Sequence, residues 1–562
     1  MRTAIAIDEL LVFSVWLCFS AIGFAAFIAV IHANVQALQP VYFLLVQAVV
    51  ASAVILVLAV CWRHVLSTAG SVGKIFGILL LGVWLVTATH MGVTAFTRHD
   101  EIYSWNLWAI KHWQRKPYDL YYTQASYPQL FAYWLASVYG AQDGFKSQLF
   151  ARLASSLPVL LLVGSALAMW PRRLAGRQAL VIGLVCIWMV ARTWPTLRLG
   201  YADPMMTAGL AVSLTCLMCY VRSGQFGWWC MSVAAAVIAA LTKQPAVLWA
   251  GGSLPLIALA GWRWNRWPIK TVAVSCGGAL LVVWVTFFVT SDITNNSGVI
   301  ARAIGDRGVL ETLGNSVFRY LVKNPDIFLV LSLSWWFSRR ITPLIHLVWW
   351  LAVLPMIGLW FTLGSYEMRQ GAHVIWLSGL LLLVGLGSRW FSASTRIDAA
   401  SRHHPVVPSF AMMSTLLVLI FSISYWSERS HHDLSDGQKM AFINQMGSTP
   451  AAQVYEKIVG NQARVFTTSN YSWGLFYGRT PVLRADLQDT EASLQSLQRL
   501  LLSVRADYAI SSGDYAYGPY SPWLVKLAEA CPKALQEVLK SSDERFTLYE
   551  VARSTLEKCR AL

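Results

Sequence analysis

Charged residues are scarce in this chain of 562 residues. Lys, Arg, Asp and Glu make up 13% of it, whereas a typical soluble domain contains about 25%. Hydrophobic residues account for 56% of the chain, and 27 residues are tryptophan. This composition excludes an ordinary soluble domain and a disordered polypeptide, since both carry more charge and fewer apolar residues. It indicates an integral membrane protein.

No small-residue cleavage site follows the first apolar run, so we predict no cleavable signal peptide. Apolar runs of about 18–20 residues cross the hydrocarbon core as helices. We identify thirteen runs, of which those of 11 to 14 residues also fit re-entrant segments. The runs are Leu10–Ile31, Val41–Cys61, Ile75–Phe96, Phe150–Trp170, Ala179–Val190, Met205–Val221, Trp228–Leu241, Ala246–Trp262, Thr271–Thr290, Ile327–Phe337, Ile341–Phe361, Val374–Leu386 and Val406–Tyr425.

Acidic residues are scarcest in this apolar part: residues 1–427 contain 13 Asp and Glu against 29 Lys and Arg. If the N-terminus is cytoplasmic, basic residues recur at every inner loop, which is the positive-inside pattern of membrane proteins. Ten of the 13 acidic residues then fall on the outer side. We therefore expect a protein of the bacterial inner membrane whose C-terminal part is periplasmic or extracellular. Because the loops explain the net charge of +16, we expect membrane lipids and no nucleic acid as partners.

The composition changes after Tyr425. Residues 428–562 contain 15 basic and 15 acidic residues, and they include neither a glycine-rich phosphate loop nor a repeat. We expect a membrane domain over residues 1–427 and a small α/β domain over residues 428–562, which is long enough to bury its own core. Its expected strands are "ARVFTTS", "TPVLRA", "DYAISS" and "RFTLYEVA", and its expected helices are Glu491–Val504 and Pro522–Lys540.

Cysteine is infrequent outside the apolar runs, which hold seven of the nine cysteines. Buried there, these behave as small apolar side chains. The other two, Cys531 and Cys559, fall in the outer domain, where a disulfide is permitted, although two free thiols fit the sequence equally well. No compact cluster of His, Cys and Asp is present, so we predict no obligatory cofactor, while a divalent metal ion stays possible.

An adjacent acidic pair, Asp100–Glu101, stands at the end of the third apolar run in the segment "TRHDEIYSWNLWAIKHW". The aromatic residues that follow it recur at helical spacing, which is typical of a helix lying in the membrane interface. The pair can cap a helix or neutralise Arg98. Ionisable groups at membrane depth are costly, however, and are usually functional.

Further charged and aromatic residues gather at the other outer turns. Taken singly, each basic residue also fits a contact with lipid headgroups. Together they offer cations for a phosphate group and carboxylates for the proton of a hydroxyl. They include Arg192, Arg198, Tyr201, Asp203, Lys243, Arg302, Glu367, Arg369 and His373.

These motifs resemble those of the GT-C superfamily of membrane glycosyltransferases, in particular its bacterial aminoarabinose-transferase and protein O-mannosyltransferase branch. The likeness rests on the acidic pair, on "YPQLFAYW", on "YADPMM" and "LTKQP", and on "YEMRQGAHVIW". It covers the whole chain in layout, but each motif is short. One difference stands out: the acidic pair follows the third apolar run, whereas in the family it usually follows the first. Either two helices precede the family core, or the runs divide differently.

The resemblance implies a sugar donor linked to polyprenyl phosphate and an acceptor hydroxyl on a glycan, a lipid-linked molecule or a protein. Transfer with inversion needs a carboxylate base and cations that hold the leaving phosphate. By this resemblance Asp100 is the base and Glu101 its catalytic neighbour. Lys243 and Arg369 lead the phosphate-binding candidates, followed by Arg198, Arg192 and Arg302. The substrate-positioning candidates are Asp203, Tyr201, Tyr127, Glu367 and Trp105.

Two other functions fit parts of the sequence. Charged residues in membrane segments also mark the pathways of transporters and lipid flippases. Such proteins often contain internal repeats, and we find none. A polymer ligase that uses lipid-diphosphate glycans would need the outer basic residues but no comparable acidic pair.

Overall fold

The computed structural model describes residues 7–68, 70–93, 96, 101–115, 128–144, 148–171, 176–285, 308–362, 368–394, 463–467, 482–484, 494–512, 520–540 and 546–559. Four of the candidate site residues, Asp100, Tyr127, Arg302 and Glu367, lie outside these ranges. So does the last apolar run, Val406–Tyr425.

The described part of residues 1–394 is almost entirely helical, as the apolar runs predict. Nine helical segments in it are long and apolar enough to cross a membrane, so the chain is an integral membrane protein. They are α1 (Glu9–Asn34), α2 (Pro40–Ser67), α3 (Ser71–Gly92), α7 and α8 (Leu149–Ser155 and Leu157–Ala168), α9 (Gly176–Leu197), α10 (Ala202–Ser223), α12 to α13 (Pro245–Leu248, Trp249–Ser253 as η2 and Leu254–Asn265), α18 to α19 (Pro343–Val348, Trp349–Val353 as η6 and Leu354–Thr362), and η7 with α20 (Met368–Gly371 and Ala372–Ser394).

Nine of the thirteen expected runs coincide with these segments, and Val406–Tyr425 lies outside the described residues. The other three runs contain helices shorter than 18 residues, which are α11 (Phe226–Ala240), α14 (Ile269–Trp284) and α17 (Pro325–Ile341). The run that contains α14 continues beyond the described residues. Apolarity therefore locates the helices of the described part correctly.

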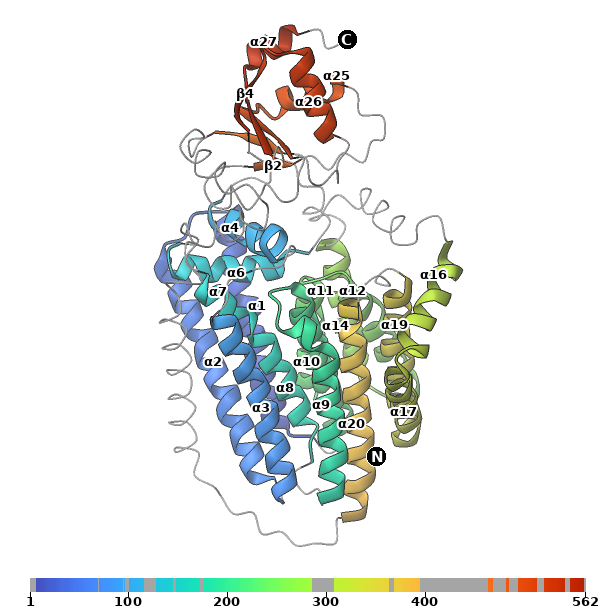
Figure 1. Cartoon of the computed structure of the whole chain (residues 1–562). Helices are drawn as coiled ribbons and strands as arrows, with labels where there is room; N and C mark the ends of the chain where they lie inside the picture. Colours follow the sequence, from blue (N-terminus) through green and yellow to red (C-terminus); the bar gives the residue numbers. More distant parts are fainter. Residues whose placement is uncertain are drawn as a thin grey trace.

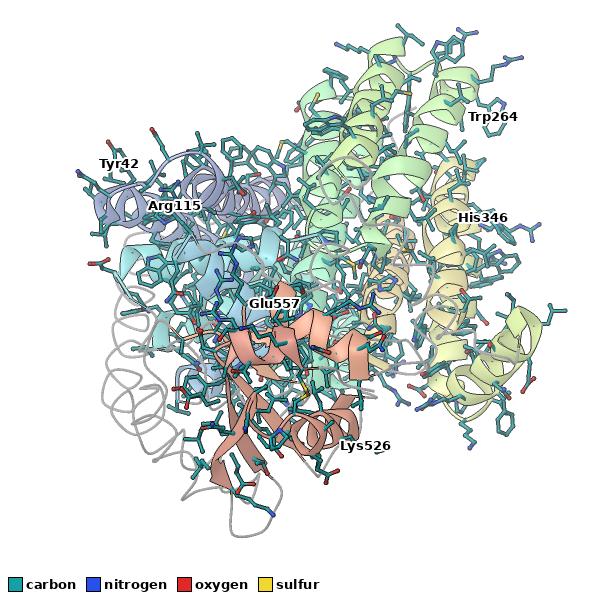
Figure 2. The ribbon with its side chains drawn as sticks, turned by 90° about the horizontal axis from the view of Figure 1, so that it is seen from above. Tyr42, Arg115, Trp264, His346, Lys526 and Glu557 are labelled. Atoms are coloured by element: carbon teal, nitrogen blue, oxygen red, sulfur yellow. A yellow bond between two sulfur atoms is a disulfide. The ribbon has the colours of Figure 1, made fainter. Side chains whose placement is uncertain are left out.

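The helices form one bundle (Figure 1), in which α1 packs against α2, α6, α8 and α10, and α20 packs against α17, α10 and α9. Nearly all of α10 and α20 is buried within the protein. In the view along the bundle, Tyr42 and Arg115 lie at one side of the molecule and Trp264 and His346 at the other (Figure 2). The end of the bundle that lies next to the C-terminal sheet is called the sheet end below.

Short helices cover the sheet end (Figure 1): η1 (Glu101–Asn106) continues into α4 (Leu107–Trp113), and α6 (Leu130–Ala141) packs against α4 and α1. The aromatic face of this segment was expected to meet the membrane interface, but Trp105 is buried, with its ring 4.9 Å from that of Trp108 and 5.8 Å from that of Phe131. The expected role of Trp105 in positioning substrate stays a prediction. The aromatic face packs on α6 because burying it there removes more apolar area from water than a half-exposed interface would.

The C-terminal part contains a five-stranded mixed sheet in the order β2-β1-β3-β5-β4. Strands β1, β2 and β3 are parallel, and β5 is antiparallel to both β3 and β4. Its strands are β1 (Val465–Thr467), β2 (Val482–Arg484), β3 (Tyr508–Ser512), β4 (Leu535–Lys540) and β5 (Phe546–Val551), and its helices are α25 (Leu494–Ser503), α26 (Tyr520–Ala530) and α27 (Arg553–Lys558).

One expected helix of this domain is wrong in its second half. The helix predicted over Pro522–Lys540 ends at Ala530, and the residues after it form strand β4. Pro532 lacks a backbone N–H and cannot continue the helix, and β4 then gains hydrogen bonds by pairing with β5. Cys531 and Cys559 form a disulfide with a Cα–Cα separation of 6.1 Å, which ties the end of α26 to the residue after α27.

Candidate functional site

The candidate site is organised around the short turn between α9 and α10. Pro195 lies in the last turn of α9, and the helix ends at Leu197. Tyr201 then adopts extended backbone and α10 begins at Ala202. Gly200 is needed within this turn, because a Cβ atom there would lie 2.3 Å from Cε1 of Phe96. The turn is therefore held close against the segment that leads to the acidic pair.

Glu101 is the centre of the first of two charged clusters at the sheet end. Its Oε1 accepts a hydrogen bond from Nη1 of Arg152 at 2.6 Å and another from the backbone N–H of Gly200 at 2.5 Å. The side chains of Arg152 and Glu101 are 2% and 0% exposed. The guanidinium carbon of Arg152 also lies 5.0 Å from the ring centroid of Phe96. A buried pair of this kind holds its two segments together, since removing either partner strands the other charge.

Arg152 was not among the sequence candidates. The signal for it was a single arginine two residues into an apolar run, where an unpaired cation would be costly. His90, at the end of α3, lies within electrostatic range of both members of this pair and of Arg198. The Arg198 side chain is half-buried and forms no ion pair with any residue that the structure describes.

A second cluster lies on the other side of the same turn. Asp203, in the first turn of α10, accepts a hydrogen bond at 2.5 Å from Nζ of Lys243, which stands between α11 and α12. The two side chains are 3% and 9% exposed. Nζ of Lys243 also lies 3.5 Å from Oε1 of Gln370, which links the pair to η7. Two residues that the sequence placed in different roles, phosphate binding and positioning, are thus one ion pair.

Arg369 joins this cluster through an aromatic ring. Its guanidinium carbon lies 4.5 Å from the centroid of the Tyr201 ring, a cation–π contact. Tyr201 is itself buried and precedes Asp203 by two residues. The structure therefore brings together four sequence candidates, Tyr201, Asp203, Lys243 and Arg369, from three separate parts of the chain. We refer to these four residues as the Lys243 cluster.

The electrostatics of the Lys243 cluster favour an anion. The four residues comprise two cations and one carboxylate, and all but the half-buried Arg369 are buried. Helices α10 and α20 pack against each other, and both begin at this cluster. Helix N-termini present unpaired N–H groups and the positive end of the helix dipole, and they bind anions. A phosphate group is an anion of suitable charge and geometry for Arg and Lys together.

Arg192 does not share this arrangement. It binds Asp326 of α17 through two hydrogen bonds, one of them from Nε at 2.5 Å, and its Nη1 reaches Asn324 at 3.2 Å. Both charged side chains are about one-third exposed, at 34% and 33%. The contact joins α9 to α17 and leaves Arg192 engaged by a carboxylate.

His373 belongs to the outer-face set predicted from the sequence, without an individual role there, and it lies in the first turn of α20. It is 2% exposed and lies within electrostatic range of Asp203 and Lys243. The available signal was its position four residues after Arg369, one helical turn further on.

No three His, Cys, Asp or Glu side chains within the described ranges are grouped so as to hold a metal ion. Comparison with protein-family models and with curated proteins found no match for this chain.

Proposed function

We propose that this protein is a membrane glycosyltransferase of the GT-C type, which moves a sugar from a polyprenyl phosphate to an acceptor hydroxyl. The observation that supports this most is the Lys243 cluster, in which a lysine and an arginine gather at a largely buried place where two helices begin. A lipid-linked phosphate reaches such a place from the membrane while its sugar faces the sheet end.

The cations of the cluster suit the leaving group of this reaction. When the bond between the anomeric carbon and the phosphate oxygen breaks, the oxygen keeps both electrons and the phosphate gains negative charge. Nζ of Lys243 carries three N–H donors, so it can hold Asp203 and still donate to a phosphate oxygen. Arg369 can donate two parallel hydrogen bonds. Both interactions are stronger in a site that excludes water than they are in solution.

The acidic pair suits the other half of the reaction. Glu101 is engaged by Arg152 and by Gly200, so its carboxylate is committed to holding the site together. Asp100 lies outside the described residues, and the family resemblance assigns it the role of base. As the acceptor oxygen attacks the anomeric carbon on the side opposite the phosphate, Asp100 takes the hydroxyl proton, and the configuration inverts.

The proposal includes the topology predicted from charge. The N-terminus is cytoplasmic, and the sheet end with the C-terminal domain faces the outer side of a bacterial inner membrane. The acceptor is a hydroxyl on a glycan, a lipid-linked molecule or a protein that is reached from that side. A transporter would place its binding site near the middle of the membrane. The Lys243 cluster lies at the ends of helices instead, which favours chemistry at the membrane surface.

The proposal is tested by donor consumption. The purified protein in lipid nanodiscs is incubated with polyprenyl-phosphate sugars and an extract of acceptors, and released polyprenyl phosphate is measured by chromatography. One positioned base contributes about 10²–10⁴-fold in rate. The Asp100→Asn variant should therefore consume the donor more slowly by this factor, while its thermal unfolding temperature is unchanged. The matched control is Asp143→Asn, which changes an exposed carboxylate after α6 and should keep full activity. Intact donor with the wild-type protein, together with substrate uptake into vesicles, would favour a transporter.

A further inference from the structure

Two buried polar side chains next to the Lys243 cluster have no hydrogen-bond partner among the residues that the structure describes. Neither ring nitrogen of His373 is bonded, although the residue is only 2% exposed. The hydroxyl of Thr207, which is 1% exposed, is unbonded too. Buried polar groups in folded proteins are almost always paired, so each exception calls for an explanation.

Both side chains border the same place. His373 follows Arg369 by one helical turn and lies within electrostatic range of Asp203 and Lys243. Thr207 follows Asp203 by four residues, which puts it on the same face of α10. The two unbonded groups therefore lie on helices that pack against each other, each about one turn from a residue of the Lys243 cluster.

The hydrogen-bonding groups of the imidazole ring determine which kind of ligand could pair with it. In either protonation state the ring has at least one N–H donor, and the neutral ring has one donor and one acceptor. A partner that pairs both nitrogens of the neutral ring must therefore offer an acceptor and a hydroxyl a few ångströms apart. A phosphodiester offers acceptors only, whereas a sugar attached to it adds hydroxyl groups.

We propose that His373 is a binding residue for the sugar-phosphate junction of the donor. One ring nitrogen donates to a non-bridging phosphate oxygen, and the other accepts a hydrogen bond from a hydroxyl of the sugar that is transferred. This inference rests on the glycosyltransferase function proposed above. It adds that the site recognises sugar and phosphate together, so that the sugar-bearing lipid is preferred over the lipid phosphate that remains after transfer.

The test compares the binding of two ligands, polyprenyl phosphate and a polyprenyl-phosphate sugar, to the full-length protein in nanodiscs. His373→Phe keeps a ring of similar size and removes both hydrogen bonds. It should weaken binding of the sugar-bearing lipid about 30- to 1000-fold, the effect of losing a hydrogen bond to a charged group together with a neutral one. Binding of polyprenyl phosphate, which loses one bond only, should weaken less. The control is His346→Phe, which changes a histidine that bonds Ser338 and Trp350 and should leave both affinities unchanged.

A second pair of variants keeps the test decisive if His373→Phe does not fold. The amide of His373→Gln reaches about as far as Nε2 and should restore most of the preference for the sugar-bearing lipid, whereas that of the shorter His373→Asn should not. Equal preference in wild-type, Gln and Asn proteins would overturn the role of His373 and leave the proposed function intact. A wild-type protein that binds neither lipid would contradict both proposals.

Discussion

The buried ion pair between Lys243 and Asp203 allows stability and function to be separated. Lys243→Met keeps the length of the side chain and removes its charge, which leaves the Asp203 carboxylate buried without its cation. Breaking a buried pair in this way costs about 3–5 kcal/mol of unfolding free energy. We expect a loss within this range because the side chains of Asp203 and Lys243 are only 3% and 9% exposed.

The double variant Lys243→Met/Asp203→Asn carries neither charge. It should therefore recover more than half of the stability that Lys243→Met loses, which a double-mutant cycle measures as coupling between the two sites. The assay is unfolding by SDS in mixed micelles, followed by tryptophan fluorescence. Recovered stability should not restore donor binding, because the phosphate has lost a cation.

Two results would refute this reasoning. If Lys243→Met unfolds like the wild-type protein, the pair does not contribute as a buried ion pair. If the double variant is as unstable as the single one, the loss comes from packing of the lysine side chain and not from the stranded carboxylate. A double variant that binds the donor normally would remove Lys243 from the phosphate site.

Three further outcomes are expected. Glu101→Gln should lower the unfolding free energy by about 3–5 kcal/mol in the same assay, because the Arg152 guanidinium is left buried without its carboxylate. Asp100→Asn should show no such loss, so the two variants can be told apart by stability. Cys559→Ser removes a disulfide that closes a loop of 28 residues and should cost about 3 kcal/mol, a loss that reduction of the wild-type protein reproduces in thermal unfolding. Burial lowers the pKa of His112 to about 3 from its ordinary 6.5, so its neutral form stabilises the fold above pH 6.5 and this contribution falls as the pH drops toward 3. At pH 5 the loss is about 2 kcal/mol, and His112→Phe should unfold with a smaller difference between pH 7 and pH 5 than the wild-type protein.

Hydrophobic pattern predicts the helices of this chain well because lipid requires every spanning segment to be apolar and to satisfy its own backbone hydrogen bonds. The same requirement says little about which helices touch. The partner of Lys243 is 40 residues earlier in the chain and Gln370 is 127 residues later, and no local pattern links them. Arg152 was missed for this reason: its role depends on Glu101, which lies 51 residues earlier in the chain.

The errors have a common cause, which is packing that overrides local preference. Trp105 has the spacing of an exposed amphipathic face, but a second helix, α6, covers that face. The residues of β4 have a helical composition, yet Pro532 ends the helix and pairing with β5 determines the outcome. The motif "YADPMM" was predicted at an outer turn, and the structure places Tyr201 just before α10 and Asp203 in its first turn.

Gly200 and Tyr201 are consecutive residues, and their Cα atoms are about 3.8 Å apart. One of them is tied to the acidic pair through Glu101, and the other lies beneath the guanidinium of Arg369. Any ligand that draws Arg369 and the tyrosine ring toward itself must pull on a peptide whose other end is anchored to the carboxylate cluster. If the proposed donor binds at Arg369, its phosphate would therefore act on a peptide that is also hydrogen-bonded to Glu101, and the two charged clusters would be mechanically coupled.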